Sequence, residues 1–228
     1  MTRTRIKICG LVREEDARAA RKFGADYVGF VLAPSRRRAE PRELASWLPA
    51  LRREDPALLT VAVFARAGLD EIERALDLVT FDLVQLHLPW PGDPRESLWP
   101  WARKRGVEVI ATTVSSAMRG EPEARPFAWL IDTPASEPSA AGEASGGSGR
   151  THDWSLIPPA PREYRMVLAG GLAPDNVGSA IRRVRPFAVD AASRLEASAG
   201  IKDHALLEKF CDEVRRADQA LREEELDV

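Results

Sequence analysis

A lysine and a cysteine lie two positions apart near the N-terminus, in the short stretch at residues 5–9. Side chains alternate between the two faces of a strand, so Lys7 and Cys9 share one face and Ile6 and Ile8 share the other. If the first face borders a polar site, the ammonium group would lower the pKa of the thiol and make Cys9 a usable base or nucleophile. The structural alternative is a small buried cysteine beside a lysine whose amino group extends to solvent.

Other residues with chemical potential also stand where strand-length apolar runs end. They are the loop Ser35, Arg36 and Arg37, the pair Gln85 and His87, the acid Asp132, the turn Gly170 and Gly171, and the segment from Asp190 to Arg194. An acid, a candidate thiolate base, a cationic loop and small-residue turns together suit an anionic substrate. In particular, a Gly-Gly turn before a helix lets backbone N–H groups approach a phosphate closely.

Each of these residues also has a structural explanation. Gly170 and Gly171 fit a plain tight turn. Asp132 is either a loop cap or a carboxyl group with a raised pKa. A single histidine such as His87 is often held by structural hydrogen bonds. The arginines at 36–38 fit a solvated loop face.

The arrangement of apolar runs predicts the fold. Strand-length runs occur at 5–9, 27–32, 58–65, 83–87, 108–114, 127–133, 165–171 and 187–193. Helical patterns follow most of them, at 13–24, 41–54, 69–79, 96–105, 173–184 and 203–222, with a poor helix at 115–126 and a short piece near 153. Eight strand–helix units predict an α/β fold, a single-domain (β/α)8 TIM barrel with its active site at the C-terminal ends of the strands. A doubly wound sheet is the alternative.

We expect residues 1–228 to form one domain. The Ser-, Gly-, Ala- and Pro-rich segment 134–151 lies inside the sixth unit and is interpreted as a mobile loop, and the acidic tail 223–228 is expected to fray.

Composition narrows the classes of function. The chain has 228 residues, a net charge of -2, 44% hydrophobic and 30% charged residues. This balance gives no electrostatic reason to expect nucleic acid as a partner, and no apolar run is long enough to cross a membrane. Two cysteines and the lack of a metal-spaced cluster predict neither a disulfide framework nor a metal site. The expected location is a reducing cytoplasm.

An ordered series of motifs resembles the phosphoribosylanthranilate isomerase family of tryptophan biosynthesis. The motifs run from the first strand to the last helix: Lys7-Ile-Cys-Gly10, Gly29-Phe-Val31, Ser35-Arg-Arg37, Val84-Gln-Leu-His87, Gly146-Gly-Ser-Gly149 before Asp153-Trp154, Leu168-Ala-Gly-Gly-Leu172 with Pro174 and Asn176-Val177, and Gly200-Ile-Lys-Asp203. Each motif is weak alone, but their order along the chain is specific.

The resemblance implies an Amadori rearrangement that needs no metal or organic cofactor. Cys9 matches the family's general base and Asp132 its general acid, while Arg37 matches the arginine that holds the anthranilate carboxylate. The remaining substrate-binding positions that the resemblance implies are Lys7, His87, Gly147, Gly170, Gly171, Asp190, Ser193 and Arg194. The expected partner is the small-molecule substrate, with no nucleic acid or membrane, and the chain is expected to be a monomer or a homodimer.

The chain departs from the family pattern after the eighth strand. The family usually shows Asp-Val-Ser-Ser-Gly-Val-Glu, whereas this chain has Ala192 in place of a hydroxyl and Arg194 in place of glycine. If the turn needs a positive φ at Arg194, the arginine strains it by about 1 kcal/mol. Alternatively, its guanidinium gives the phosphate a charged partner. A second departure, 88–90 after His87, alters only the rim.

Two other functions therefore remain open. One is a catalytically degenerate barrel that binds a phosphorylated metabolite or a protein partner, suggested by Ala192 and Arg194. The other is a different sugar-phosphate isomerase or lyase, because a fold alone does not define a function.

Overall fold

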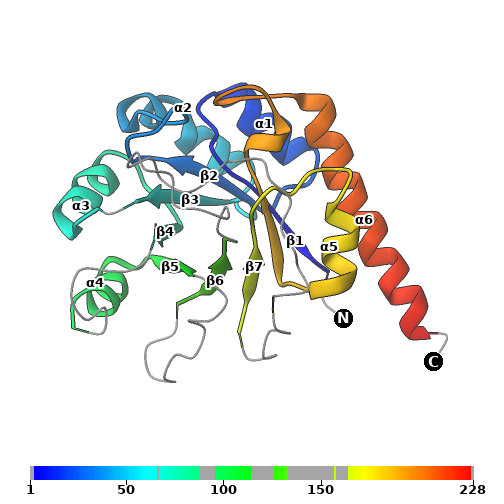
Figure 1. Cartoon of the computed structure of the whole chain (residues 1–228). Coiled ribbons are helices and arrows are strands. Elements are labelled where there is room, and N and C mark those ends of the chain that lie inside the picture. The colour runs from blue at the N-terminus through cyan, green and yellow to red at the C-terminus, as the bar shows by residue number, and fades with distance from the viewer. Residues whose placement is uncertain are drawn as a thin grey trace, which may run out of the picture.

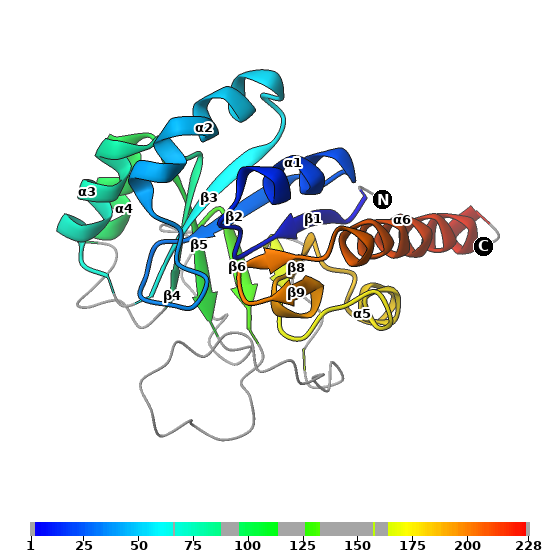
Figure 2. The same cartoon turned by 90° about the horizontal axis from the view of Figure 1, so that it is seen from above.

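Eight parallel strands close into a barrel in which each strand pairs with the next and β8 pairs with β1 (Figures 1 and 2). The computed structural model describes residues 3–65, 67–87, 96–113, 126–132, 157 and 164–226. The closed order confirms the barrel and excludes the doubly wound sheet. The strands are β1 (Arg5–Ile8), β2 (Tyr27–Val31), β3 (Leu59–Phe64), β4 (Leu83–His87), β5 (Glu108–Thr113), β6 (Ala128–Ile131), β7 (Met166–Leu168) and β8 (Ala188–Ala191).

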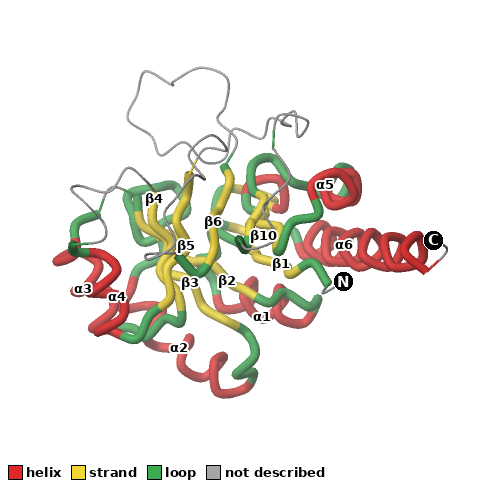
Figure 3. Tube along the Cα trace, turned by 90° about the horizontal axis from the view of Figure 1, so that it is seen from below, coloured by secondary structure: helices red, strands yellow, loops and turns green. Residues whose placement is uncertain are grey.

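The described helices lie on the outer side of the barrel, as the tube in Figure 3 shows. They are α1 (Glu14–Lys22), α2 (Pro41–Glu54), α3 (Leu69–Leu78), α4 (Leu98–Arg105), α5 (Val177–Val184) and α6 (His204–Leu226). The outward faces of the strands and the inner faces of these helices form one apolar layer, and the inward faces form a second, smaller cluster that includes Cys9. No described helix is long and apolar enough to span a membrane.

Most predicted element boundaries agree with the structure, and three differ in ways that matter. The helix predicted from 173 begins at Val177, because the Asn176 side chain accepts from the Ala173 N–H and donates to the Gly171 carbonyl, both at 2.9 Å, and so holds a turn. The tail predicted to fray from 223 is helical through Leu226. There, a hydrogen bond from Gln219 to Glu223 and an ion pair from Arg185 to Glu225 hold the last turns.

The third difference is a hairpin that the sequence did not predict. After β8 and the short 3-10 helix η3 (Ser193–Leu195), the strands β9 (Glu196–Ser198) and β10 (Ile201–Lys202) pair antiparallel. The hairpin leads directly into α6 and places Glu196 opposite Lys202. The predicted helical segments at 115–126 and near 153, and the loop 134–151, lie essentially outside the described residues.

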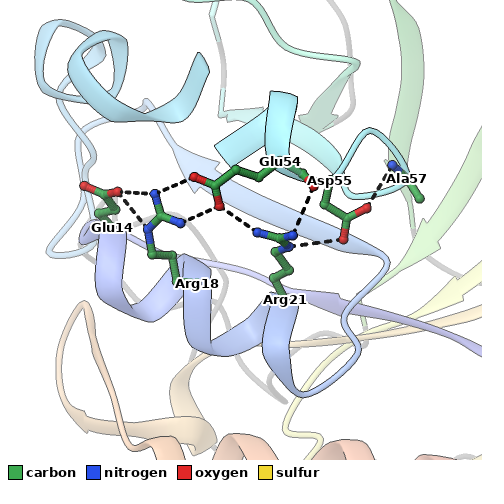
Figure 4. A network of polar contacts seen from close by, with 6 residues as sticks. All are labelled: Glu14, Arg18, Arg21, Glu54, Asp55 and Ala57. Atoms are coloured by element: carbon green, nitrogen blue, oxygen red, sulfur yellow. Dashed lines mark hydrogen bonds and ion pairs between the residues drawn. The ribbon is translucent and has the colours of Figure 1, made fainter. Parts of the chain in front are cut away.

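Helices α1 and α2 are joined by a network of ion pairs (Figure 4). Arg18 lies between Glu14 and Glu54, with nitrogen–oxygen distances of 2.7 Å to each. Arg21 contacts the same Glu54 at 2.8 Å and Asp55 at 3.3 Å. All five side chains are at least partly exposed, so water and salt screen these pairs and their contribution to stability is small.

A buried carboxylate on α6 is hydrogen-bonded to Thr4, the residue just before β1. Asp218 accepts the Thr4 N–H at 2.7 Å and the Thr4 hydroxyl at 2.6 Å, and both residues are buried. We expect Asp218→Ala to lower the free energy of unfolding by about 2 kcal/mol, because it leaves buried donors on Thr4 without an acceptor. Urea denaturation followed by circular dichroism measures this loss.

The matched control is Asp212→Ala on the same helix, which removes an exposed ion pair with Arg215. Its effect should stay within about 0.5 kcal/mol. Equal losses in the two variants would contradict a specific role for the contact between Thr4 and Asp218.

Candidate active site

One pocket lies at the C-terminal ends of the barrel strands, and most of the predicted site residues line it. Those that do are Cys9, Arg37, Asp132, Gly170, Gly171, Asp190 and Ser193. They come from strands, loops and turns spread from β1 to η3, so barrel closure brings them together. Gly147 lies outside the described residues. His87 ends β4, and its side chain is not described.

Cys9 follows β1 directly and is held by backbone hydrogen bonding to β8, with its N–H donating to the Ala191 carbonyl at 2.9 Å. Its thiol fits because the neighbouring strand carries a glycine: a Cβ on Gly29 would lie 2.9 Å from the Cys9 sulfur and 3.3 Å from the Lys7 nitrogen. Burial raises the pKa of the Cys9 thiol, and Lys7 opposes this only in part. The expectation of a lowered thiol pKa is therefore wrong, because desolvation outweighs the ammonium charge.

Lys7 does not extend to solvent. Its side chain is 1% exposed, and its ammonium group forms an ion pair with Asp190 at 2.8 Å. The two residues are register partners on β1 and β8. Burial disfavours the ammonium, but the charges of Asp190 and Cys9 outweigh that cost and raise the pKa of Lys7. Lys7 thus stays charged beneath the pocket, beside the thiol rather than in the pocket wall.

Asp132 stands one residue past β6, in the wall of the same pocket. Burial and, secondly, the negative charge of Asp190 raise the pKa of Asp132 to about 7. A carboxyl group with this pKa holds a proton near neutral pH and can also release it. The pocket therefore combines a buried thiol with a carboxylic acid suited to proton transfer.

Of the three arginines at 36–38, Arg37 is the one that lines the pocket, together with Ser35 of the same loop. Arg37 passes over Gly10, where an added Cβ would lie 2.8 Å from the arginine Cδ. Its Nε–H donates to both carboxylate oxygens of Glu196, at 2.8 and 3.0 Å. Glu196 also accepts from Lys202 at 2.9 Å.

The Gly170 and Gly171 turn has the backbone conformation that requires glycine, with φ values of 92° and 64°. Ser193 lines the pocket beside it. Arg194 reaches back over this turn, with its guanidinium 3.0 Å from Asp175 and 3.5 Å from the Gly171 carbonyl oxygen. Among the described non-glycine residues only Arg185 has a positive φ, so the predicted strain at Arg194 is absent. The reason is that residues 193–195 form a 3-10 turn with ordinary backbone angles.

Gln85, which the sequence places at a strand end with His87, lines the pocket and is buried, and its side-chain carbonyl oxygen has no hydrogen-bond partner among the described residues. Two further polar residues near the site, Glu196 and Lys202, were not predicted to take part. The sequence shows Lys202 only within the Gly200-Ile-Lys-Asp203 motif and Glu196 only at the end of the segment after the eighth strand. Among the described residues, no group of His, Cys, Asp and Glu is arranged to hold a metal ion.

The closed eight-strand barrel and the position of this pocket place the chain among the (β/α)8-barrel enzymes, whose active sites lie at this end of the strands. A thiol, an acid of raised pKa and an arginine in one pocket are typical of acid–base chemistry on an anionic small molecule.

Comparisons with known proteins identify the family. The family model described as N-(5'phosphoribosyl)anthranilate (PRA) isomerase matches residues 6–213. The N-(5'-phosphoribosyl)anthranilate isomerase of Dechloromonas aromatica (strain RCB) is 38% identical over 227 residues, which cover 96% of this chain and 100% of the relative. That of Pseudomonas fluorescens (strain Pf0-1) is 38% identical and covers 94% of this chain and 100% of the relative. The chain therefore belongs to the N-(5'-phosphoribosyl)anthranilate isomerase family and is an isomerase.

Solved structures agree. Phosphoribosyl anthranilate isomerase from Thermotoga maritima has a TM-score of 0.77 and 36% identity, covering 93% of this chain and 99% of that chain. A second phosphoribosyl anthranilate isomerase, in complex with reduced 1-(o-carboxyphenylamino)-1-deoxyribulose 5-phosphate, has a TM-score of 0.74 and 34% identity, with the same coverage.

Proposed function

We propose that this chain catalyses the Amadori rearrangement of N-(5-phosphoribosyl)anthranilate with Asp132 as general acid and Cys9 as general base. The observation that carries the proposal is the placement of both groups in one pocket, with the pKa of Asp132 raised to about 7. The resemblance of the motifs around Cys9 and Asp132 to the family supports the same two roles.

Asp132 donates its proton to the ribose ring oxygen. The bond from C1 to that oxygen breaks, and the nitrogen lone pair forms a protonated imine with C1. The Cys9 thiolate then removes the proton from C2, and the electrons of the C2–H bond form a C1=C2 double bond while the imine electrons return to nitrogen. The resulting enolamine tautomerises to the 2-ketone, so substrate and product are isomers. Each positioned acid or base contributes about 10²–10⁴ in rate.

The substrate's two anionic ends are assigned to separate parts of the pocket. The Arg37 guanidinium is a planar donor suited to the anthranilate carboxylate. The N–H groups around Gly170, Gly171 and Ser193 suit the phosphate, with the Arg194 guanidinium close above the same turn. For the other positions that the resemblance implies, we propose that Lys7 acts from beneath the pocket, that Asp190 acts from the pocket wall, and that His87 and Gly147 contact substrate from the rim.

The degenerate-barrel alternative loses one of its two grounds. Arg194 causes no backbone strain, and its guanidinium lies beside the turn assigned to phosphate. Ala192 still lacks a hydroxyl, but its carbonyl oxygen accepts a hydrogen bond from Lys202 at 2.9 Å.

The test is turnover of phosphoribosylanthranilate by the purified chain, followed by the loss of anthranilate fluorescence. We expect substrate to disappear with the chain present and the 1-(2-carboxyphenylamino)-1-deoxyribulose 5-phosphate product to form. No turnover above a buffer control would overturn the proposal in favour of a degenerate barrel. Turnover that survives Arg37→Ala unchanged would instead favour another sugar-phosphate substrate.

The proposed roles predict a defined pH profile. The productive form pairs protonated Asp132 with the Cys9 thiolate, and the pKa of Cys9 lies above its ordinary value while that of Asp132 is about 7. Below pH 7, raising the pH only creates more thiolate, so kcat/KM should rise with a slope of one. Above about pH 7 the gain in thiolate is offset by loss of the acid, so the profile should be level until Cys9 titrates.

Initial rates from about pH 5 to about pH 10 measure this profile. A profile that is already level well below pH 7 would contradict the raised pKa of Asp132.

Two coarser expectations accompany the function. We infer a reducing cytoplasmic location, supported by Cys9 and Cys211, which are both buried free thiols. We also infer a monomer or a homodimer. A similar solved structure, 33% identical with a TM-score of 0.70, is described as generated monomers of the dimeric isomerase from Thermotoga maritima.

A further inference from the structure

Arg37 is held by a second residue, and the hydrogen bonds use only one edge of its guanidinium. The Nε–H donates to both oxygens of Glu196, whose side chain is 4% exposed. Within the described part of the chain, the two terminal nitrogens of Arg37 have no protein partner. The guanidinium is therefore fixed through Nε while the edge suited to a planar, two-point contact with a carboxylate stays available.

The position of Glu196 is itself set by buried contacts. Lys202 donates to Glu196 at 2.9 Å and to the Ala192 carbonyl at 2.9 Å, and the Lys202 side chain is fully buried. The cationic Arg37 and Lys202 lower the pKa of Glu196 despite burial, which keeps it ionised. Arg37 and Lys202 thus share one carboxylate, and burial lowers the pKa of Lys202 although Glu196 opposes that effect.

The hairpin that carries this cluster is fastened to α1. Asp16, which is fully buried in α1, accepts the Lys202 backbone N–H at 3.2 Å. The Asp16 carboxylate also contacts His204 at 2.8 Å and accepts hydrogen bonds from Nε and Nη2 of Arg13. These contacts keep β10, and with it Lys202, in one place.

The geometry points to Glu196 as a positioning residue that orients Arg37 toward the aryl carboxylate of the substrate, with Lys202 holding Glu196 in place. This inference rests on the proposed function and deepens it, because it names what makes the site selective for a carboxylate-bearing aromatic ring. Glu196 does not itself line the pocket; it lies behind Arg37 and contacts the pocket through that residue. Its effect is therefore expected on substrate binding rather than on the chemical steps.

The test is a double-mutant cycle with Glu196→Gln and Arg37→Ala, measured as kcat and KM for phosphoribosylanthranilate. We expect Glu196→Gln to raise KM about 10-fold and to change kcat less than about 3-fold. Arg37→Ala should raise KM about 100-fold, and the double variant should match Arg37→Ala, because Glu196 acts only through Arg37.

A matched control removes a similar charge elsewhere. Glu54→Gln breaks contacts to two arginines on α1, neither of which lines the pocket, and should change neither constant. Glu196→Asp keeps a negative charge in the cluster but shortens the side chain that reaches Arg37, so it should raise KM in the same direction. Glu196→Asp replaces Glu196→Gln as the test variant if Glu196→Gln folds poorly.

Three outcomes would overturn the inference. The first is an unchanged KM in both Glu196 variants, and the second is a loss confined to kcat. The third is a double variant whose fold-change in KM equals the product of the fold-changes in Glu196→Gln and Arg37→Ala. A purely structural role gives the second outcome, because a smaller folded fraction lowers kcat and leaves KM unchanged. Failure of the proposed function is distinct, since the unmodified chain would then show no turnover at all.

Discussion

Cys9→Ala is expected to lower kcat by at least about 10³-fold, because the Cys9 thiolate is the group assigned to take the C2 proton and alanine carries no base to replace it. The fold should be retained. Cys9 is a small side chain whose neighbours are held by backbone hydrogen bonds between β1 and β8, and alanine fits the same space. Stopped assays with concentrated enzyme measure the residual rate, and circular dichroism and thermal unfolding check the fold.

Cys211→Ala is the control for loss of a thiol. Cys211 is fully buried in α6, on the outer side of the barrel, where burial raises its thiol pKa to about 12. Its removal should leave kcat and KM unchanged and lower stability only modestly, as expected for a small core truncation. A Cys9→Ala variant with kcat within about 10-fold of the unmodified chain would contradict the assignment of the base.

Sequence periodicity predicted the barrel because the strands are short apolar runs and most of them are followed by a helical pattern. The barrel in turn predicts that residues at the strand ends lie close together, because the C-terminal ends of all parallel strands lie at one end of the barrel. The prediction that Cys9, Asp132, Gly170 and Asp190 share a site rests on topology alone, and their common place in one pocket wall agrees with it. The pattern of apolar runs was therefore sufficient to predict the strands and the residues that end them.

Features that depend on barrel closure were not predictable in this way. The ion pair of Lys7 with Asp190 joins residues 183 positions apart, and the sequence shows only that Lys7 stands near Cys9. For this reason the effect of burial on the Cys9 pKa was missed. The hairpin was missed because its strands, of three and two residues, carry no apolar run. Lys202 is fully buried only because Glu196 and the Ala192 carbonyl satisfy its charge.

Asp132→Asn should reduce kcat by about 10³-fold or more, because asparagine keeps the shape and the hydrogen bonding of the acid but has no proton to give to the ribose ring oxygen. KM should change little, since no anionic end of the substrate is assigned to Asp132. Steady-state rates with phosphoribosylanthranilate give both constants. A variant that keeps more than about a tenth of the activity would assign the acid elsewhere.

The same substitution should also stabilise the fold at high pH. The pKa of Asp132 is raised from 3.8 to about 7 in the folded chain, so its stabilising contribution is fully present below pH 3.8 and is lost as the pH rises through 7. Asparagine cannot ionise and avoids that loss. We therefore expect Asp132→Asn to raise the free energy of unfolding by about 2 kcal/mol at pH 8, with a smaller gain at about pH 5.

Urea unfolding at the two pH values measures this difference, with Asp175→Asn at an exposed position as the control for loss of a carboxylate. A substitution that removes activity and adds stability marks a group kept for chemistry rather than for folding, because packing alone would favour the neutral side chain. A variant that is inactive and also less stable at pH 8 would mean that the Asp132 carboxylate has a structural partner, and that its raised pKa does not arise from burial and the charge of Asp190.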